Sequence, residues 1–165
     1  MLDLSAQISN INDSDLLCYV TISPASLLLE DLEMNGQVLN RLVQEFYVFG
    51  KRMGYGEPIV KSKGTISEIY ILGSPAIQVE VDWYENNLFM YAVNIRYDRI
   101  PDEDVIYTYP DGQWCGKYIE ELYRVKRPPV TDKNRRYSPE YLYDCLEFYI
   151  KLIEHDPSVL KNILK

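Results

Sequence analysis

The stretch that decides the fold runs over residues 77–83 and reads Ile-Gln-Val-Glu-Val-Asp-Trp. Apolar and polar residues alternate strictly along it, and a period of two is the pattern of a half-buried β-strand. Its polar face carries Gln78, Glu80 and Asp82. The stretch Glu85-Asn86-Asn87 follows, and asparagine tolerates the positive φ that tight hairpin turns need. We therefore expect a hairpin whose return strand covers residues 88–97.

Similar patterns lie on both sides of this hairpin. Residues 65–72 predict a preceding strand, and Gly73-Ser74-Pro75 is a turn between the two strands. Residues 105–109 and 113–115 flank the turn Pro110-Asp111-Gly112 and predict a further hairpin. Together these segments predict an antiparallel meander of about four to six strands.

Helical patterns precede and follow the meander. Ser23-Pro24 is a helix start signal, and apolar residues then recur every three or four positions as far as Met53. We expect this N-terminal helical region to be interrupted near Asn35-Gly36. A short helix is predicted over residues 116–125, and Ser138-Pro139-Glu140 begins a C-terminal helix. Helices, then strands, then helices indicate an α+β fold.

The chain has 165 residues, the size of one domain, so residues 1–165 are expected to form a single domain. Residues 1–14 have the composition of a loose entry segment, and residues 126–137 form a basic, proline-containing loop. The apolar stretches are too short to span a membrane, and the first residues lack the features of a secretion signal. Cys18, Cys115 and Cys145 are widely spaced, as in reduced thiols. We therefore expect a cytoplasmic protein that has no membrane partner.

Charge is distributed unevenly along the chain. The net charge is −8, although residues 124–136 contain six Lys or Arg and only one acid. A predominantly acidic surface repels nucleic-acid phosphates and attracts basic proteins. The basic segment is expected to be either a solvated loop or one that docks on the acidic surface of its own protein. The charge pattern favours a protein partner with a basic surface over nucleic acid.

The sequence contains no recognisable catalytic set. Its single histidine, His155, is placed at the C-terminal end of the last helix, where an imidazolium favours the negative end of the helix dipole. No cysteine pair has the spacing of a zinc site, and no glycine-rich phosphate loop is present. We therefore expect no enzyme, no metal and no cofactor.

Glu80 and Asp82 are the acids for which we weigh a chemical role. Two carboxylates on one strand face could hold a magnesium ion in a metal-dependent hydrolase, or they could simply occupy the wetter face of a sheet. A third possibility is a surface for protein binding, because acids bordered by aromatic rings can receive Lys or Arg side chains. The residues of this candidate surface are Glu80, Asp82, Tyr84, Glu85, Phe89 and Tyr91, with the acidic loop Asp102, Glu103 and Asp104.

In general character the chain resembles the immunity proteins of bacterial polymorphic-toxin systems. The resemblance lies in residues 76–87, which read Ala-Ile-Gln-Val-Glu-Val-Asp-Trp-Tyr-Glu-Asn-Asn, and in the tyrosine-rich helix that begins at Ser138. It implies an acidic antitoxin that neutralises a cognate toxin by direct binding, and it implies no residue-level roles. A regulatory or assembly subunit without catalysis is the other non-enzymatic hypothesis.

Overall fold

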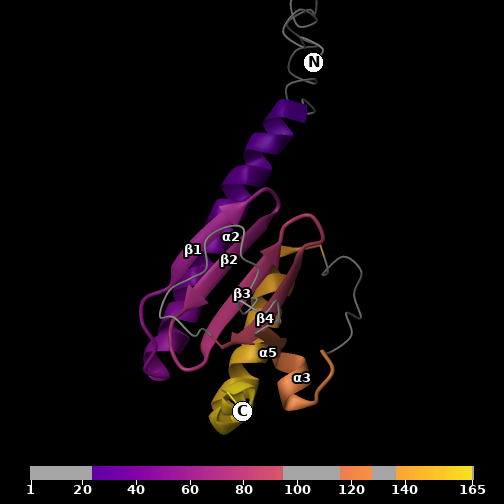
Figure 1. Ribbon diagram of the computed structural model, residues 1–165. Helices are drawn as coiled ribbons and strands as arrows, with labels where there is room; N and C mark the ends of the chain where they lie inside the picture. Colours follow the sequence, from indigo (N-terminus) through magenta and orange to yellow (C-terminus); the bar gives the residue numbers. More distant parts are fainter. Residues whose placement is uncertain (1–23, 95–115, 128–136, 165) are drawn as a thin grey trace, which may run out of the picture. The chain divides into compact units, whose positions relative to one another are not determined.

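A computed structural model describes residues 24–94, 116–127 and 137–164, and it places the side chains of residues 31–94, 116–127 and 137–163 (Figure 1). The chain divides into two compact units, Met1–Leu39 and Asn40–Lys165. The sheet, the C-terminal helices and the part of the N-terminal helix from Asn40 onward belong to the second unit. The predicted second hairpin, over residues 105–115, and the loop Asp102–Asp104 lie outside the described residues, and the single domain stays a prediction.

Five strands form one antiparallel sheet in which the spatial order follows the order along the chain. The strands are β1 (Ile59–Lys63), β2 (Ile66–Ile71), β3 (Ala76–Asp82), β4 (Asn87–Val93) and β5 (Gly116–Tyr118). Together with the N-terminal and C-terminal helices, this sheet confirms the predicted α+β fold. The return strand of the central hairpin ends at Val93, which is earlier than residue 97.

The helical elements are α2 (Pro24–Arg52), α3 (Ile119–Tyr123), α5 (Pro139–His155) and the 3-10 helix η3 (Pro157–Leu164). The expected interruption near Asn35-Gly36 is wrong, because α2 is continuous. An isolated glycine costs a helix only about 1 kcal/mol relative to alanine and does not by itself end it. Residues 116–118 are also a strand, and the short helix begins only at Ile119. His155 ends α5, as expected.

The core lies between one face of the sheet and two helices. In Figure 1 the strands lie in front of α5 and of the C-terminal half of α2. The helices bury their apolar stripes against alternate residues of the central strands. The buried helical residues are Leu42, Phe46, Phe49, Leu142, Leu146, Tyr149 and Ile153, and the sheet contributes Ile69, Ile71, Ile77, Val79, Val81, Leu88 and Met90. The apolar residues of the alternating strand β3 thus lie on the face of the sheet that the helices cover.

The opposite face of the sheet carries the polar residues of β3 together with a second group of buried side chains. That group consists of Tyr70, Ala76, Tyr91 and Val93, with Leu72 and Phe89 packed against it. Gln78 lies between Tyr70 and Tyr91 in the strand register and is only 2% exposed. This face, called the polar face below, therefore combines carboxylates with aromatic rings, and it holds most of the predicted site.

Candidate functional site

Three acids share the polar face at one end of the sheet. Glu80 and Asp82 lie two residues apart on β3, and Glu68 on β2 is the register partner of Glu80. We call Glu68, Glu80 and Asp82 the acidic cluster. Glu68 was not among the predicted site residues, although counting outward from the turn at residues 73–75 pairs residue 68 with residue 80.

The strand register brings Glu68 and Glu80 close together. The backbone N–H of Trp83 donates to the carbonyl of Thr65 at 2.9 Å, which makes Thr65 and Trp83 a hydrogen-bonded pair. Hydrogen-bonded and non-hydrogen-bonded pairs alternate along an antiparallel ladder, so Glu68 and Glu80 form a non-hydrogen-bonded pair. Side chains approach each other most closely at such positions, where the Cα atoms are about 4.5 Å apart. Two like charges thus lie directly opposite each other, an arrangement that destabilises a sheet.

Only Glu68 has a basic residue beside it in this row. Lys61 on β1 is the register partner of Glu68 on its other side. Glu80 forms no ion pair with any residue that the structure describes. Burial raises the pKa of Glu80, and the charges of Glu68 and Asp82 raise it further, while a hydrogen bond with the Tyr91 side chain opposes these effects in part. Burial also raises the pKa of Glu68, an effect that Lys61 partly opposes. Glu80 is thus a partly buried carboxylate that lacks a cation.

Gln78 places a buried hydrogen-bond acceptor on the polar face, in addition to the carboxylates. Its Nε2 donates to Glu68 Oε1 at 3.1 Å, and Tyr70 donates its hydroxyl to Glu68 Oε2 at 2.9 Å. The other amide atom, Gln78 Oε1, is buried and has no hydrogen-bond partner among the residues that the structure describes. A buried acceptor without a donor is unfavourable by about 1–3 kcal/mol. The region therefore has more acceptors than donors.

Asp82 has a structural role that the sequence analysis did not assign to it. Its Oδ1 accepts hydrogen bonds from the backbone N–H groups of Tyr84 at 2.9 Å and Glu85 at 3.1 Å. This aspartate turn, with Asn86 at a φ of 45°, closes the four-residue loop between β3 and β4. In the alternative in which Glu80 and Asp82 hold a metal ion, one oxygen of Asp82 is thus already occupied by backbone N–H groups.

The remaining predicted residues divide into exposed and enclosed positions. Tyr84 is 80% exposed at the hairpin tip, and Glu85 beside it is also exposed. Tyr91 is only 6% exposed, and its ring lies 4.6 Å from that of Tyr118. Phe89 is half-buried, and the guanidinium of Arg127 lies 5.1 Å from its ring centre. Tyr91 and Phe89 therefore lie beside the acids on the same face but expose little of their rings.

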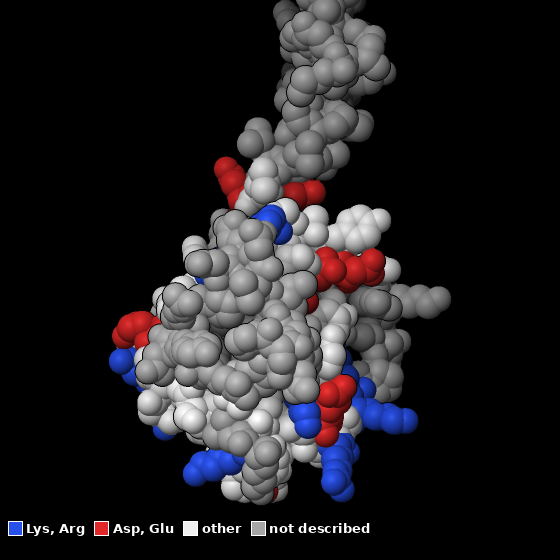
Figure 2. Space-filling model, in the orientation of Figure 1, with Lys and Arg blue, Asp and Glu red and all other residues white. Residues whose placement is uncertain are grey.

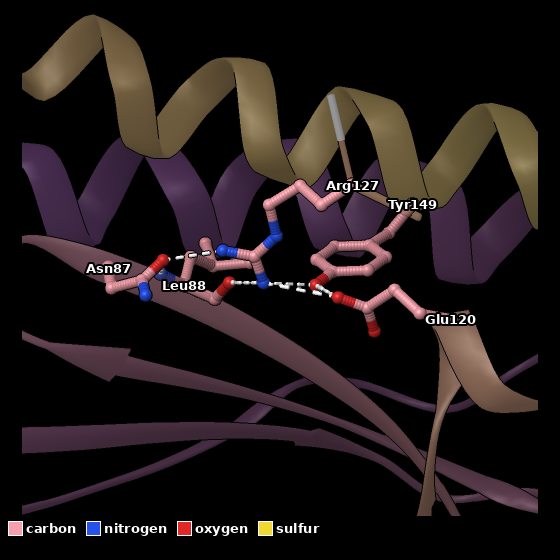
Figure 3. Close-up of polar contacts among 5 residues, drawn as sticks. All are labelled: Asn87, Leu88, Glu120, Arg127 and Tyr149. Atoms are coloured by element: carbon pink, nitrogen blue, oxygen red, sulfur yellow. Dashed lines mark hydrogen bonds and ion pairs between the residues drawn. The ribbon is translucent and has the colours of Figure 1, made fainter. Parts of the chain in front are cut away.

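Arg127 is the centre of a polar network between β4, α3 and α5 (Figure 3). Its Nη1 donates to Asn87 Oδ1 at 2.5 Å, and its Nη2 donates to the Leu88 carbonyl at 2.6 Å. Nη2 also contacts Glu120 Oε1 at 3.3 Å and the hydroxyl of Tyr149, which in turn donates to Glu120. Burial raises the pKa of Tyr149, and its hydrogen bond to Glu120 raises it further.

The network closes the edge of β4 where β5 is too short to cover it. β5 pairs only with Tyr91, Ala92 and Val93, whereas Arg127 contacts the carbonyl of Leu88. Arg127 belongs to the basic segment 124–136 and contacts other parts of its own chain, whereas residues 128–136 lie outside the described residues. The sequence analysis did not find the network because its members come from three segments far apart in the chain.

Charged groups and a hollow also occur elsewhere in the described part of the chain. On the face seen in Figure 2 the described acidic and basic side chains form several separate groups. Within the described residues, no three His, Cys, Asp or Glu side chains are arranged to hold a metal ion. A hollow of about 220 Å³ is lined in part by Tyr55, Ser74 and Lys161, and burial raises the pKa of Tyr55 to about 12. None of the described helices has the length and apolar character needed to cross a lipid bilayer.

The chain matches no protein-family model, no curated protein and no solved structure. Function must therefore be argued from the acidic cluster and its surroundings.

Proposed function

We propose that this chain is a cytoplasmic protein-binding module of the immunity or antitoxin kind, which binds a basic surface of its partner at the acidic cluster. The observation that carries the proposal is the position of Glu80. It lies directly opposite Glu68, it is partly buried, and no described residue supplies it with a cation. A Lys or Arg side chain from a partner would neutralise this arrangement.

Three further features support the proposal. The chain carries a net charge of −8, which would steer a basic partner toward it. Tyr84 and Glu85 are exposed at the hairpin tip next to Asp82, and tyrosine is enriched at recognition surfaces. Next to the acidic cluster, the buried Gln78 Oε1 is an acceptor without a donor among the described residues, which adds to the negative potential of this face. Positions that violate local folding rules are where functional sites are expected.

The alternative of a metal-dependent hydrolase has less support. It would use Glu80 and Asp82 as ligands, but Asp82 Oδ1 already accepts two backbone N–H groups. A regulatory subunit without catalysis would use the same surface as the immunity protein and differs from it only in the identity of the partner.

The test begins with partner identification by co-purification from the source cells. Replacing Glu80→Gln removes one charge and keeps the shape of the side chain. We expect it to weaken binding at least about tenfold, because an interfacial ion pair loses one member. It should also reduce the loss of affinity between about 50 and about 300 mM salt, since fewer charges are left to screen. Isothermal titration calorimetry measures both quantities.

The matched control is Glu147→Gln. Glu147 is an acid on α5 that is paired with Lys151, and it lies on the helical layer and not on the polar face. This variant changes the net charge by the same amount and should bind like the parent. If Glu80→Gln bound as tightly as the parent, with the same salt dependence, the interface would lie elsewhere.

A further inference from the structure

A second surface, distinct from the acidic cluster, lies at the outer edge of β1. β1 is the terminal strand of the sheet in the described part of the chain, and no described strand pairs with its outer side (Figure 1). Its apolar residues Ile59 and Val60 are 39% and 41% exposed. An open edge of this kind is a template for another strand.

The backbone groups on this edge follow from the sheet register. The Thr65–Trp83 bond makes Ser67, Ile69 and Ile71 the β2 residues whose backbone groups face β3. The alternate β2 residues then face β1 and pair with Ile59, Lys61 and Lys63. The N–H and C=O groups of Val60 and Ser62 therefore point outward. These four groups are the pairing positions for an added strand.

The charges beside this edge indicate the character of the strand. Lys61 and Lys63 lie on the same side of β1, because they are two residues apart. Lys63 is exposed and forms no ion pair with a described residue. Opposite charges across a strand pair stabilise it and like charges destabilise it. An added strand is thus favoured if it carries acids opposite these lysines.

The same lysines argue against a second copy of the chain. In an antiparallel pairing of β1 with β1 of a second copy, the register that matches all five residues places Lys61 opposite Lys61 of the other copy. Lys63 would then face Ile59 of the other copy, so neither lysine would lie opposite an acid of that copy. Lysines on edge strands commonly prevent self-pairing in this way, while they leave the edge open to a complementary strand.

From these observations we propose that β1 binds an extended acidic segment of another protein, which adds to the sheet as a sixth strand. Backbone hydrogen bonds to Val60 and Ser62 supply pairing, and acids at alternate positions contact Lys61 and Lys63. On the other side of the strand, an apolar residue packs beside Val60. This division between backbone pairing and side-chain selection is the usual mode of strand addition.

The test uses two capped seven-residue peptides, one alternating valine with glutamate and the other alternating valine with lysine. Each is titrated to about 1 mM, the range expected for a weak single-strand contact, into the full chain labelled with 15N. We expect the amide resonances of Val60 and Ser62 to shift with the glutamate peptide alone. Replacing Lys63→Glu should weaken the glutamate peptide about two- to fivefold, the effect of one exposed ion pair.

Lys63 is exposed, so the variant is expected to fold, and circular dichroism checks this. Lys61 is avoided because it also balances Glu68. Equal binding of the two peptides, shifts confined to other strands, or the absence of shifts would each overturn the proposal. A dimer of the free chain that a Val60→Lys substitution disperses would overturn it in favour of self-pairing.

Discussion

Glu80 and Arg127 are both partly buried charged residues, but their surroundings differ. Arg127 donates to Asn87 and Leu88, contacts Glu120 and Tyr149, and lies over the ring of Phe89. Glu80 faces another glutamate and has no cation among the described residues. A buried charge that is paired with an opposite charge holds a structure together, whereas one that lacks a counter-charge is more informative about binding. The two residues therefore carry different predictions.

Replacing Arg127→Met should destabilise the chain by up to about 3 kcal/mol, because it leaves the partly buried Glu120 without its cation. The substitution also removes the donor to the Leu88 carbonyl at the open edge of β4. Urea denaturation measures the free energy of unfolding. The neighbouring Lys126→Met is the control, since Lys126 is exposed, and it should change stability by no more than about 0.5 kcal/mol. Equal effects of the two substitutions would show that the network contributes little.

At the scale of elements, Asp82 has two roles in the β3–β4 hairpin. Burial raises the pKa of Glu80 most, and the charges of Glu68 and Asp82 raise it further. The Oδ1 atom of Asp82 also holds the turn, because it accepts two backbone hydrogen bonds. Asn86 joins the hairpin to the C-terminal helix, because its Nδ2 donates to the carbonyl of Ser138 at 3.1 Å. The turn thus positions both the acidic cluster and the N-terminal end of α5.

Substitutions at Asp82 can distinguish these roles. Asp82→Asn keeps an oxygen for the two backbone N–H groups, so its free energy of unfolding should stay close to that of the parent. Asp82→Ala removes both hydrogen bonds and should destabilise the chain by about 1–2 kcal/mol. Thermal denaturation followed by circular dichroism compares them. If the alanine variant were as stable as the asparagine variant, the turn would not depend on this side chain.

The hairpin was predictable because its signals are local. Strict alternation in residues 77–83 predicts β3, and the asparagines that follow predict the turn. The continuity of α2 through Gly36 was not predictable in this way, since a single glycine weakens a helix without necessarily ending it. Residues 116–118 form a strand because they pair with β4, and this pairing between distant segments is not indicated by the local sequence pattern.

At the scale of the whole molecule, contacts between distant segments account for what the sequence did not reveal. The register partner of Glu80 follows from a short turn and could have been found by counting. The network around Arg127 joins residues from β4, α3, α5 and the segment after α3, and no spacing in the sequence indicates that arrangement. Of the predicted site, Glu80 and Asp82 lie together on β3, and Tyr84 and Glu85 lie at the adjacent hairpin tip. Phe89 and Tyr91 lie on the same face of the sheet but expose little of their rings.

The paired glutamates should also make the stability of the whole chain depend on pH. Burial raises the folded-state pKa of Glu80 and Glu68 above that of the unfolded chain, so the folded state holds their protons more tightly. Their contribution to stability is therefore fully present below the unfolded-state value of about 4.3 and is lost as pH rises through the raised values.

Replacing Glu80→Gln removes this loss, so at pH 7 the variant should be more stable than the parent by up to about 1 kcal/mol. The difference should shrink as pH falls toward about 4.3, where Glu80 of the parent is protonated in the fold. Urea denaturation of both chains across this pH range measures the difference in free energy of unfolding.

Glu147→Gln, which loses an ion pair with Lys151, should give no stabilisation at pH 7. A Glu80→Gln chain that is less stable than the parent at pH 7 would mean that favourable contacts of Glu80, such as its hydrogen bond with Tyr91, outweigh its repulsion by Glu68 and Asp82. The weaker partner binding expected of this variant could then follow from a disturbed fold. With the expected stabilisation, weaker binding can be assigned to the lost charge itself.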